Sequence, residues 1–422
     1  MTGTPPWTEL QPRGFRPLSA RTRLTEYSPI SKELLDARLP SVDDPHVGIT
    51  TDGSPIPGLA STSATGVPTA QIVEAAQTFL RLLTADQRRD VSFPLGASEQ
   101  RLWLNMHPNY LRHGLMLEVL GTDLRDAAMR LMATCFSDRG FQQARDVMRI
   151  NGLLVEITKS ADEFGEWPYW ISIFGEPSAT EPWAWQIDGH HLNLNVFVLG
   201  DQIIFTPSFM GSEPCDIEEG LLAGVNVFRP EHDAGLAFMR SLTETQLREA
   251  VFAPSIARDA LPPELHDPID GRMQVGALND NRVLRYEGVA GQSLDDTQRL
   301  LLRNLIGEYV GWGASGHAAV KMADVERHLG DTHVLWMGRI GDHGPFYYRV
   351  HSPVVLIEFD HHPGIVFDNT EPSHHHTHTI IRTPNGGDYG TDLLREHHRQ
   401  YDHSTGAHPT LVAKPDQTRL YN

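Results

Sequence analysis

The chain contains little cysteine and little positive charge. Only Cys135 and Cys215 occur among 422 residues, and neither belongs to a C-x-x-C pair. A disulfide framework is therefore excluded, and a reducing compartment, the cytoplasm, is expected. Lysine and arginine number 35 against 54 aspartate and glutamate residues, which gives a formal net charge of -19. Because nucleic-acid affinity depends on counterion release by Lys and Arg clusters, we expect no nucleic-acid partner.

Long apolar runs and several catalytic motifs are also missing. The first thirty residues contain no apolar run of about 7–15 residues, and no later stretch reaches about 18 residues without a charge. We therefore expect neither an export signal nor a membrane partner. The sequence has no G-x-S-x-G, no P-loop and no G-x-G-x-x-G after a strand. Serine hydrolases, nucleoside triphosphatases and Rossmann dehydrogenases lose their usual support.

Helical and strand-like patterns alternate along the chain. Apolar residues recur at three- and four-residue spacing over about 68–158, and helices are expected again over about 231–310. Segments rich in β-branched and aromatic residues follow each helical part, over about 169–211 and 333–383. The order predicts an α+β fold, with a mixed or antiparallel sheet gathered from two strand-rich segments and helices packed on it.

The expected domain organisation follows from these patterns. Residues 1–65 are rich in Pro, Ser, Thr and Gly and predict an extended N-terminal arm. We expect one interleaved catalytic domain over 66–400 and a C-terminal tail over 401–422.

Two segments of the helical parts resemble each other. "TFLRLLTADQRRDVSFP" (78–94) and "AFMRSLTETQLREAVFAP" (237–254) both carry a threonine followed three residues later by glutamine. Thr84 with Gln87, and Thr243 with Gln246, predict capping boxes at helix starts. The likeness is consistent with an internal repeat, or with two helical hairpins that converged on the same capping chemistry.

Histidine is abundant, with 22 residues, and four of these lie in "SHHHTHTIIRT" (373–383). In a strand, His374, His376, His378 and Arg382 share one face. An H-x-H pair on a strand places two imidazoles side by side, about 7 Å apart at the backbone, as a two-nitrogen metal site requires. The alternative is a polar, solvated strand end.

A second histidine pair lies in "PWAWQIDGHHLNLNVFVLG" (182–200). His190 and His191 precede an alternation that places two asparagines on one strand face, which is unusual because asparagine is depleted in strands. A polar cavity with aromatic walls explains this pattern, whereas a plain aromatic core is the alternative for the tryptophans. The predicted pocket residues are Trp183, Trp185, Asn193 and Asn195.

"VVLIEFDHHPGIVFD" (354–368) places Glu358 in the middle of an apolar strand. A buried carboxylate stays charged only beside a cation or hydrogen-bond donors. Next to His376 and His378 it would complete a set of two histidines and one carboxylate. The alternatives are an outward-facing glutamate or a salt bridge with Arg349 or Arg382.

These runs, together with "HTHTIIRTPNGGDYGTDLLREHH" (376–398), resemble a large bacterial and fungal family that is catalogued only as a domain of unknown function. Its hallmarks are a W-G-W-x-x-x-G-H-H-L strand and a later I-E-F-D … H-x-H-T-x-x-R … D-x-G-x-D-L-L segment. The resemblance spans about residues 70–400 but implies no reaction. The residues that match the hallmarks are Trp183, Trp185, Gly189, His190, His191, Glu358, Asp360, His376, His378, Arg382, Asp388, Gly390 and Asp392.

The chain departs from the family pattern in two places. Ala184 stands where the family has the glycine between the tryptophans, and the connection "HHPGIVFDNTEPSHH" (361–375) is longer and richer in histidine. We therefore expect no ligand role for the extra histidines, which are His361, His362, His374 and His375.

The predicted site is a metal centre. Its expected ligands are His190, His191, His376 and His378, which would bind a divalent ion (Zn, Fe or Mn) with a coordination position left open. Glu358 is an expected catalytic carboxylate, and Glu213 in "GSEPCD" is a further candidate for a general base. Arg382 would hold a substrate carboxylate or phosphate, unless it forms a salt bridge with Asp388 or Glu358. Asp388 and Asp392 would orient ligand histidines.

The sequence thus predicts a cytoplasmic, metal-dependent enzyme, a hydrolase or lyase, whose partner is a small polar, anionic substrate. A non-haem iron oxygenase is the nearest alternative. There are two further alternatives. One is a non-catalytic protein that binds a ligand or metal, and the other is a histidine interface that is sensitive to pH at about pH 6. The substrate, the metal and the oligomeric state stay open.

Overall fold

The structure, a computed structural model, describes residues 6–13, 19–22, 29–262, 265, 270–341 and 344–400. The tail expected over 401–422 lies outside these residues. The part expected to be an extended arm includes a ten-residue helix, α1 Pro29–Arg38. Across the described ranges, no helix combines the length and apolar character needed to cross a bilayer.

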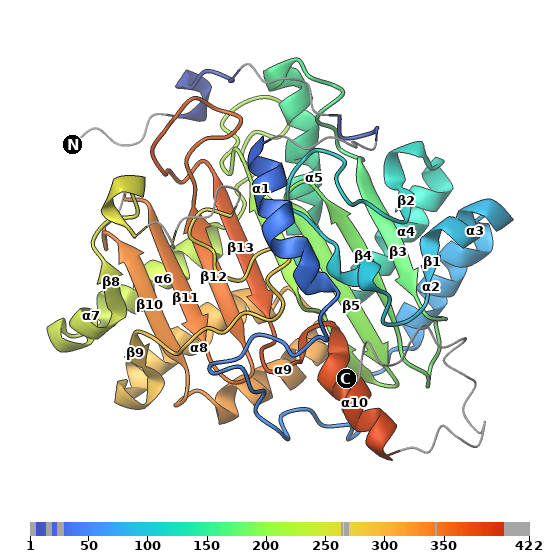
Figure 1. Ribbon diagram of the computed structural model, residues 1–422. Helices are drawn as coiled ribbons and strands as arrows, with labels where there is room; N and C mark the ends of the chain where they lie inside the picture. The colour runs from blue at the N-terminus through green and yellow to red at the C-terminus, as the bar shows by residue number, and fades with distance from the viewer. Residues whose placement is uncertain are drawn as a thin grey trace.

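One mixed sheet of thirteen strands organises the described residues (Figure 1). The strands are β1 Ser92–Phe93, β2 Leu115–Met116, β3 Tyr169–Phe174, β4 Trp183–Gly189, β5 Leu192–Leu199, β6 Gln202–Ile204, β7 Ser208–Ser212, β8 Val251–Ala253, β9 Val289–Ala290, β10 His333–Gly338, β11 Phe346–His351, β12 Leu356–His361 and β13 Thr377–Arg382. Their main order is β1-β3-β4-β5-β7-β13-β12-β11-β10-β8, and β7 pairs with β13 where the two strand-rich segments meet. The predicted α+β class, with its sheet gathered from two segments, is confirmed.

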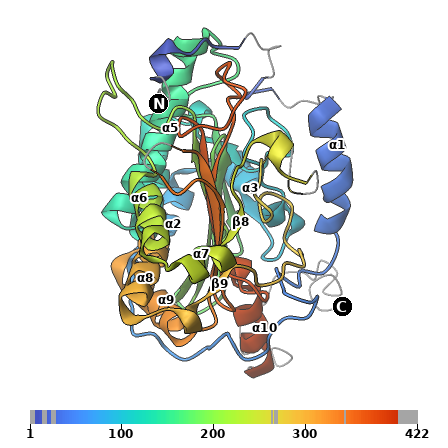
Figure 2. The same cartoon turned by 90° about the vertical axis from the view of Figure 1, so that its left-hand side faces the viewer.

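Helices cover the two faces of the sheet unequally. They are α2 Ala70–Leu82, α3 Ala85–Val91, α4 Thr122–Cys135, α5 Asp138–Thr158, α6 Arg229–Ser241, α7 Glu244–Ala250, α8 Asp296–Val310, α9 Ser315–Arg327 and α10 Thr391–Gln400. Seen along the sheet, α2, α5, α6, α8 and α9 lie on one side, and α1 and α10 lie on the other (Figure 2). We call these the helix face and the loop face.

The order of elements repeats between the two halves of the chain. The run α2, α3, β1, β2, α4, α5, β3, β4, β5 and β7 matches α6, α7, β8, β9, α8, α9, β10, β11, β12 and β13. The pairing repeats as well, because β1 is parallel to β3 as β8 is to β10, and these are the two parallel pairs among the named strands. Both expected capping boxes are present, at the starts of α3 and α7. The similarity seen in the sequence therefore extends to a whole repeated unit.

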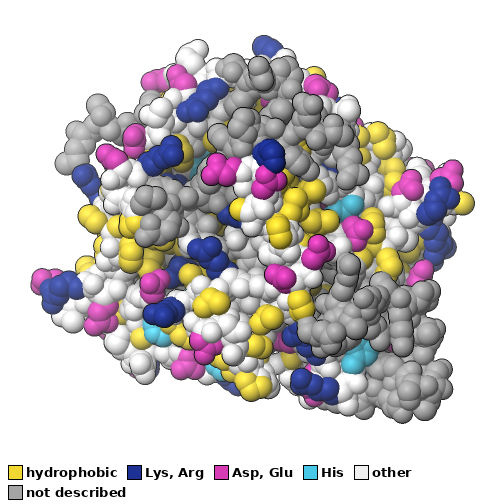
Figure 3. Space-filling view, viewed as in Figure 1, with side chains coloured by type: hydrophobic (Ala, Val, Ile, Leu, Met, Phe, Trp, Pro, Cys, Tyr) yellow, Lys and Arg dark blue, Asp and Glu magenta, His cyan; other side chains and the backbone are white. Residues whose placement is uncertain are grey.

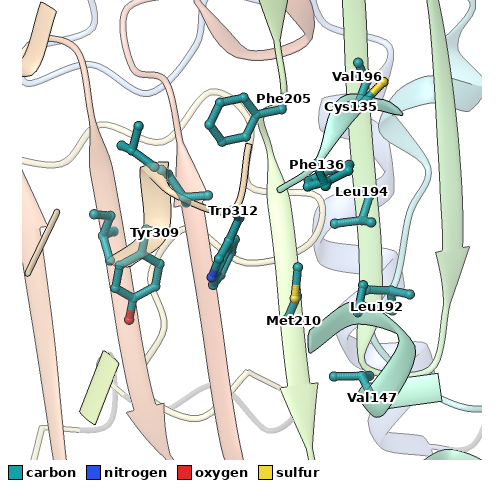
Figure 4. Packing of buried hydrophobic residues seen from close by; sticks show 14 of the residues in the cluster. Cys135, Phe136, Val147, Leu192, Leu194, Val196, Phe205, Met210, Tyr309 and Trp312 are labelled. Carbon is teal, nitrogen blue, oxygen red and sulfur yellow. The ribbon is translucent and has the colours of Figure 1, made fainter. Parts of the chain in front are cut away.

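The strand alternation separates an apolar face from a polar one. On the helix face, Leu192, Leu194 and Val196 of β5 pack with Met210 of β7 against α4 and α5 (Figure 4). Full burial of each such side chain contributes about 1.5–3 kcal/mol to stability. The intervening residues of β5, β12 and β13 face the loop side, where buried polar groups collect. The candidate site lies on this loop face.

Histidines are mostly interior residues here, and they are sparse on the surface shown in Figure 3. His46 and His351 are buried away from the histidine motifs, with exposed fractions of 4% and 1%. The pKa of both imidazoles is lowered to about 3, chiefly by burial, and Arg349 contributes to the lowering at His351. Both rings are therefore neutral in the folded protein near neutral pH.

We expect this burial to make the protein sensitive to acid. Below about pH 6.5 the unfolded chain protonates each imidazole while the folded chain does not, so the free energy of unfolding falls by about 1.4 kcal/mol per pH unit for each residue. The loss continues down to the folded pKa of about 3. His46→Leu and His351→Leu should each reduce this pH dependence by about 1.4 kcal/mol per pH unit, the contribution of one proton, in urea unfolding between about pH 4.5 and 6. An unchanged pH dependence of the unfolding free energy in both variants would contradict the assignment of His46 and His351 as buried, neutral imidazoles.

Candidate metal centre

Three histidines from distant parts of the chain meet on the loop face. His191 is the second residue of the two-residue turn between β4 and β5, His376 directly precedes β13, and His378 lies within β13. Strand β7 lies between β5 and β13, with Leu192 opposite Met210 and Gly211 opposite His378. This register brings the turn beside the start of β13, although the two lie almost two hundred positions apart.

The three imidazoles converge through the same ring atom. The Nε2 atoms of His376 and His378 are 3.0 Å apart, and the Nε2 atom of His191 lies 3.3 Å from the first and 3.2 Å from the second. An ion with Zn–N bonds of about 2.0–2.1 Å separates two ligand nitrogens by about 3.0 Å in octahedral and about 3.4 Å in tetrahedral geometry. The observed spacings fall within that interval, so the triad fits a divalent metal ion.

The triad sits directly over a glycine of β7. A Cβ atom added to Gly211 would lie 2.9 Å from Cδ2 of His378 and 3.1 Å from Cδ2 of His191. A side chain at this position would therefore displace two of the three rings. The absence of a side chain is what lets the imidazoles approach the sheet.

His191 is held in an uncommon backbone conformation. Its φ is +57°, in the left-handed region that non-glycine residues rarely adopt. Its N–H donates to the carbonyl of Asn105 at 2.9 Å, and its carbonyl accepts from the N–H of Gly211 at 2.7 Å. Such conformations persist where surrounding contacts enforce them, often at functional sites.

Protonation also favours metal binding. Burial, reinforced by neighbouring histidines, lowers the pKa of His191 and of His378 well below the usual value, so both rings are neutral at pH 7. The Nδ1 atom of His376 lies 2.8 Å from the carbonyl oxygen of Pro363, which can only accept a hydrogen bond. In neutral His376 the proton is therefore on Nδ1, and the Nε2 lone pair points at the other two rings.

Two further histidines pack against the triad without joining it. His190 stacks on His191 with ring centroids 4.0 Å apart, and its Nδ1 lies 2.7 Å from Oδ1 of Asn151. His362 packs on His378, also at 4.0 Å. Within the described ranges, the group whose ligand atoms all lie within 4.8 Å of one another contains His191, His376 and His378, but not His190 and no carboxylate.

Asp360, rather than Glu358, is the strand neighbour of His378. Its carboxylate accepts from Nε of Arg272 at 2.6 Å and lies 3.0 Å from Nε2 of His362. Although burial alone would raise the pKa of Asp360, Arg272 and His362 lower it to about 2. In the sequence Asp360 stood out only as the last residue of the I-E-F-D hallmark, without an assigned role, and no ligand role was expected for His362.

Glu358 lies two residue pairs away along β12, opposite Ile380. It accepts hydrogen bonds from the N–H groups of Gln274 and Val275 and from the hydroxyl of Tyr347. Burial raises the pKa of Glu358. The expected set of two histidines and this carboxylate is therefore not formed.

Arg382 shares the loop face with His378 but lies at the opposite end of β13. Its guanidinium binds Asp388 at 2.7 Å, the carbonyl of Val275 at 2.9 Å, and Asp280. These contacts match the salt-bridge alternative and leave the expected substrate-binding role without support. Asp388 forms an ion pair with Arg382 instead of orienting a histidine.

Asp392 also lies away from the triad, at the start of α10, where its carboxylate accepts from the N–H of Leu393 at 2.7 Å. Burial raises the pKa of Asp392 to about 6. The structure gives no support to the expected role of Asp392 in orienting a ligand histidine.

The expected pocket residues are buried in two different environments. Trp183 and Trp185 belong to the core on the helix face, so the sheet separates them from the triad. Asn193 and Asn195 lie on the loop face in a ladder of side-chain hydrogen bonds, in which Gln186 donates to Asn195 and Asn195 donates to Asn193, both at 2.7 Å. The asparagines thus satisfy one another, as buried amides require, and the predicted aromatic-walled pocket is not formed by these four residues.

Glu213 follows β7 directly, and its Oε2 atom lies 3.3 Å from Nδ1 of His376. Of the expected site residues outside the triad, it is the carboxylate that the structure brings to a ligand histidine.

The fold and site together define an α+β protein of two repeated halves with a buried trihistidine site at their junction. The chain belongs to the family described as "Protein of unknown function (DUF3500)", whose model matches residues 65–391. The family resemblance seen in the sequence is thereby confirmed. Neither the curated proteins nor the solved structures compared with the chain gave a match.

We expect Gly211→Ala to weaken metal binding by at least about 10-fold, because a methyl group would push against His378 and His191, and displaced ligands reduce affinity. Gly307→Ala is the matched control, since a Cβ there meets nothing within 4 Å inside α8. Chelator competition measures both affinities. Equal affinities for the two variants would show that the triad does not bind the ion.

Replacing Arg382 should lower the stability of the protein and leave metal binding unchanged. Arg382→Met leaves buried Asp388 without its cation and leaves Asp280 with Arg101 alone, which costs about 3–5 kcal/mol of unfolding free energy. Arg81→Met, whose exposed side chain pairs with exposed Glu74, should change stability by less than about 1 kcal/mol. Urea unfolding checks the first effect, and elemental analysis checks that the folded variant retains metal.

Proposed function

We propose that this protein is a metal-dependent enzyme that acts on a small polar molecule by hydrolase or lyase chemistry. The observation that carries the proposal is the convergence of three imidazole Nε2 atoms to within 3.0–3.3 Å. Three protein ligands leave at least one coordination position for water or substrate, which is the property that distinguishes catalytic from structural sites.

The ligand set favours zinc over iron. Non-haem iron oxygenases commonly use two histidines and one carboxylate, whereas the described residues place a third histidine where that carboxylate would lie. A bound divalent ion would polarise a substrate carbonyl or lower the pKa of a bound water molecule. The hydrolase or lyase proposal therefore has more support than the oxygenase alternative.

The surrounding residues have positioning roles in this proposal. The turn conformation of His191 and its two backbone hydrogen bonds fix the ligand from the first half of the chain. Pro363 fixes the tautomer of His376. His190 stacks on His191, His362 packs in a tilted contact on His378, and both cover the faces of these rings.

The charge of the substrate is left open. The expected anionic substrate depended on Arg382, whose guanidinium is occupied by two carboxylates and a carbonyl. Arg272, the arginine bound to Asp360 beside the triad, also donates to the carbonyls of Ile256 and His361. We therefore propose a small polar substrate that binds chiefly through the metal.

A non-catalytic metal site is the second candidate. The three side chains are closely enclosed, with exposed fractions of 7% for His191, 1% for His376 and 2% for His378. They also join the two repeated halves of the chain, as a structural ion would. The two candidates differ in whether a small exogenous molecule reaches the metal.

We expect untagged protein to contain about one zinc ion per chain, and alanine at position 191, 376 or 378 to lower metal affinity by more than about 100-fold, because loss of a ligand exceeds the 10–100-fold effect of outer partners. Elemental analysis and chelator competition measure these effects. His351→Ala, a buried histidine outside the triad, should retain the ion. Loss of metal from this control and the triad variants alike would contradict the ligand assignment.

Cobalt substitution separates the enzyme from the structural site. Adding azide to the Co²⁺-loaded protein should change its visible absorption, because an open position accepts an exogenous ligand. A spectrum that stays unchanged at high azide would indicate a closed, structural centre. That result would contradict the enzyme proposal without contradicting the expected zinc content.

A further inference from the structure

The carboxylate of Glu213 binds the backbone of a neighbouring loop. Its side chain is buried, and its two oxygens accept hydrogen bonds from the N–H groups of Ile365, Val366 and Phe367 at 2.9–3.1 Å. Three successive N–H groups directed at one anion form a nest, a backbone arrangement that binds negative charge. A carboxylate with so many donors has little capacity left to accept a substrate proton.

This loop is the connection between β12 and β13, and it carries the hydrogen-bond partner of a ligand histidine. The carbonyl of Pro363 lies 2.8 Å from Nδ1 of His376, and Oε2 of Glu213 lies 3.3 Å from the same nitrogen. The N–H of His362 donates to the carbonyl of His376 at 2.7 Å. The loop, the carboxylate and the ligand histidine therefore form one hydrogen-bonded unit.

We infer that Glu213 is a positioning residue for the metal centre, which rests on the proposed metal-binding function. It holds the loop that presents the Pro363 carbonyl, and it places a negative charge beside the Nδ1–H group of His376. Both effects fix the ring orientation and make Nε2 a stronger donor to a metal, as outer carboxylates do for ligand histidines. The general-base role expected from the sequence is replaced by this one.

Glu358 provides a matched control. It is also fully buried, and it also accepts from successive backbone N–H groups, those of Gln274 and Val275. It lies opposite Ile380, however, and not beside a ligand histidine. The two glutamates therefore share a structural task, and only Glu213 adds a contact with the triad.

The test compares Glu213→Gln with Glu358→Gln in the full-length protein. An amide has one acceptor oxygen, so each variant loses acceptor capacity at its loop and both should unfold at lower urea concentration. Zn²⁺ affinity should fall by about 10–100-fold in Glu213→Gln and by less than about 3-fold in Glu358→Gln. The visible absorption of the Co²⁺-loaded protein should shift only in Glu213→Gln.

Glu213→Asp covers the case in which the amide variant does not fold. It retains the charge but has a shorter side chain, which cannot contact both the loop and His376, so Zn²⁺ affinity should again decrease. Affinity and Co²⁺ spectrum equal to wild type in whichever Glu213 variant folds would overturn the positioning role while leaving the metal site intact. Equal losses in the Glu213 and Glu358 variants would do the same. Wild-type protein that binds no Zn²⁺ would overturn the proposed function, and the positioning role with it.

Discussion

The antiparallel pairing of β7 with β13 is the interaction on which the site depends. It joins the two repeated halves of the sheet, and its register sets Gly211 opposite His378. Because β5 pairs with the other edge of β7, the turn that carries His191 comes to lie beside the same glycine. A shift of this register by one residue would turn His378 to the helix face and separate the triad.

The repeated halves are not equivalent in chemistry. The β4–β5 turn of the first half carries His190 and His191, whereas the corresponding β11–β12 connection is Ser352-Pro353-Val354-Val355. At the far end of β13, Arg382 pairs with Asp280 and Asp388 in a buried cluster of charged groups, whereas the other end carries the three converging histidines. One fold unit used twice therefore supplies the scaffold, while the functional groups gather at one end of the central strand pair.

The fold class and two motifs could be predicted from the sequence because they depend on local rules. Strand periodicity identified the two strand-rich segments. The H-x-H pair, His376 and His378, and one histidine of the "GHH" turn converge in the structure. The roles of Glu358 and Arg382 could not be predicted, because both depend on which residue lies opposite and on what the loop at 270–285 supplies. Periodicity assigns a residue to a face of a strand, but it does not give the position along the sheet at which that residue meets its neighbours.

The same limit explains why His190 was grouped with the ligands. His190 stacks on His191, but its Nδ1 lies 2.7 Å from Oδ1 of Asn151, and its ring stays outside the group of converging nitrogens. Once His376 carries its proton on Nδ1, its Nε2 presents a lone pair to two other buried nitrogens about 3 Å away. A single N–H shared between two rings would satisfy one pair and leave the third nitrogen facing a lone pair, a costly arrangement in a buried site. A divalent cation satisfies all three at once, and this is the physical reason to regard the cluster as a metal centre and not as a group of core histidines.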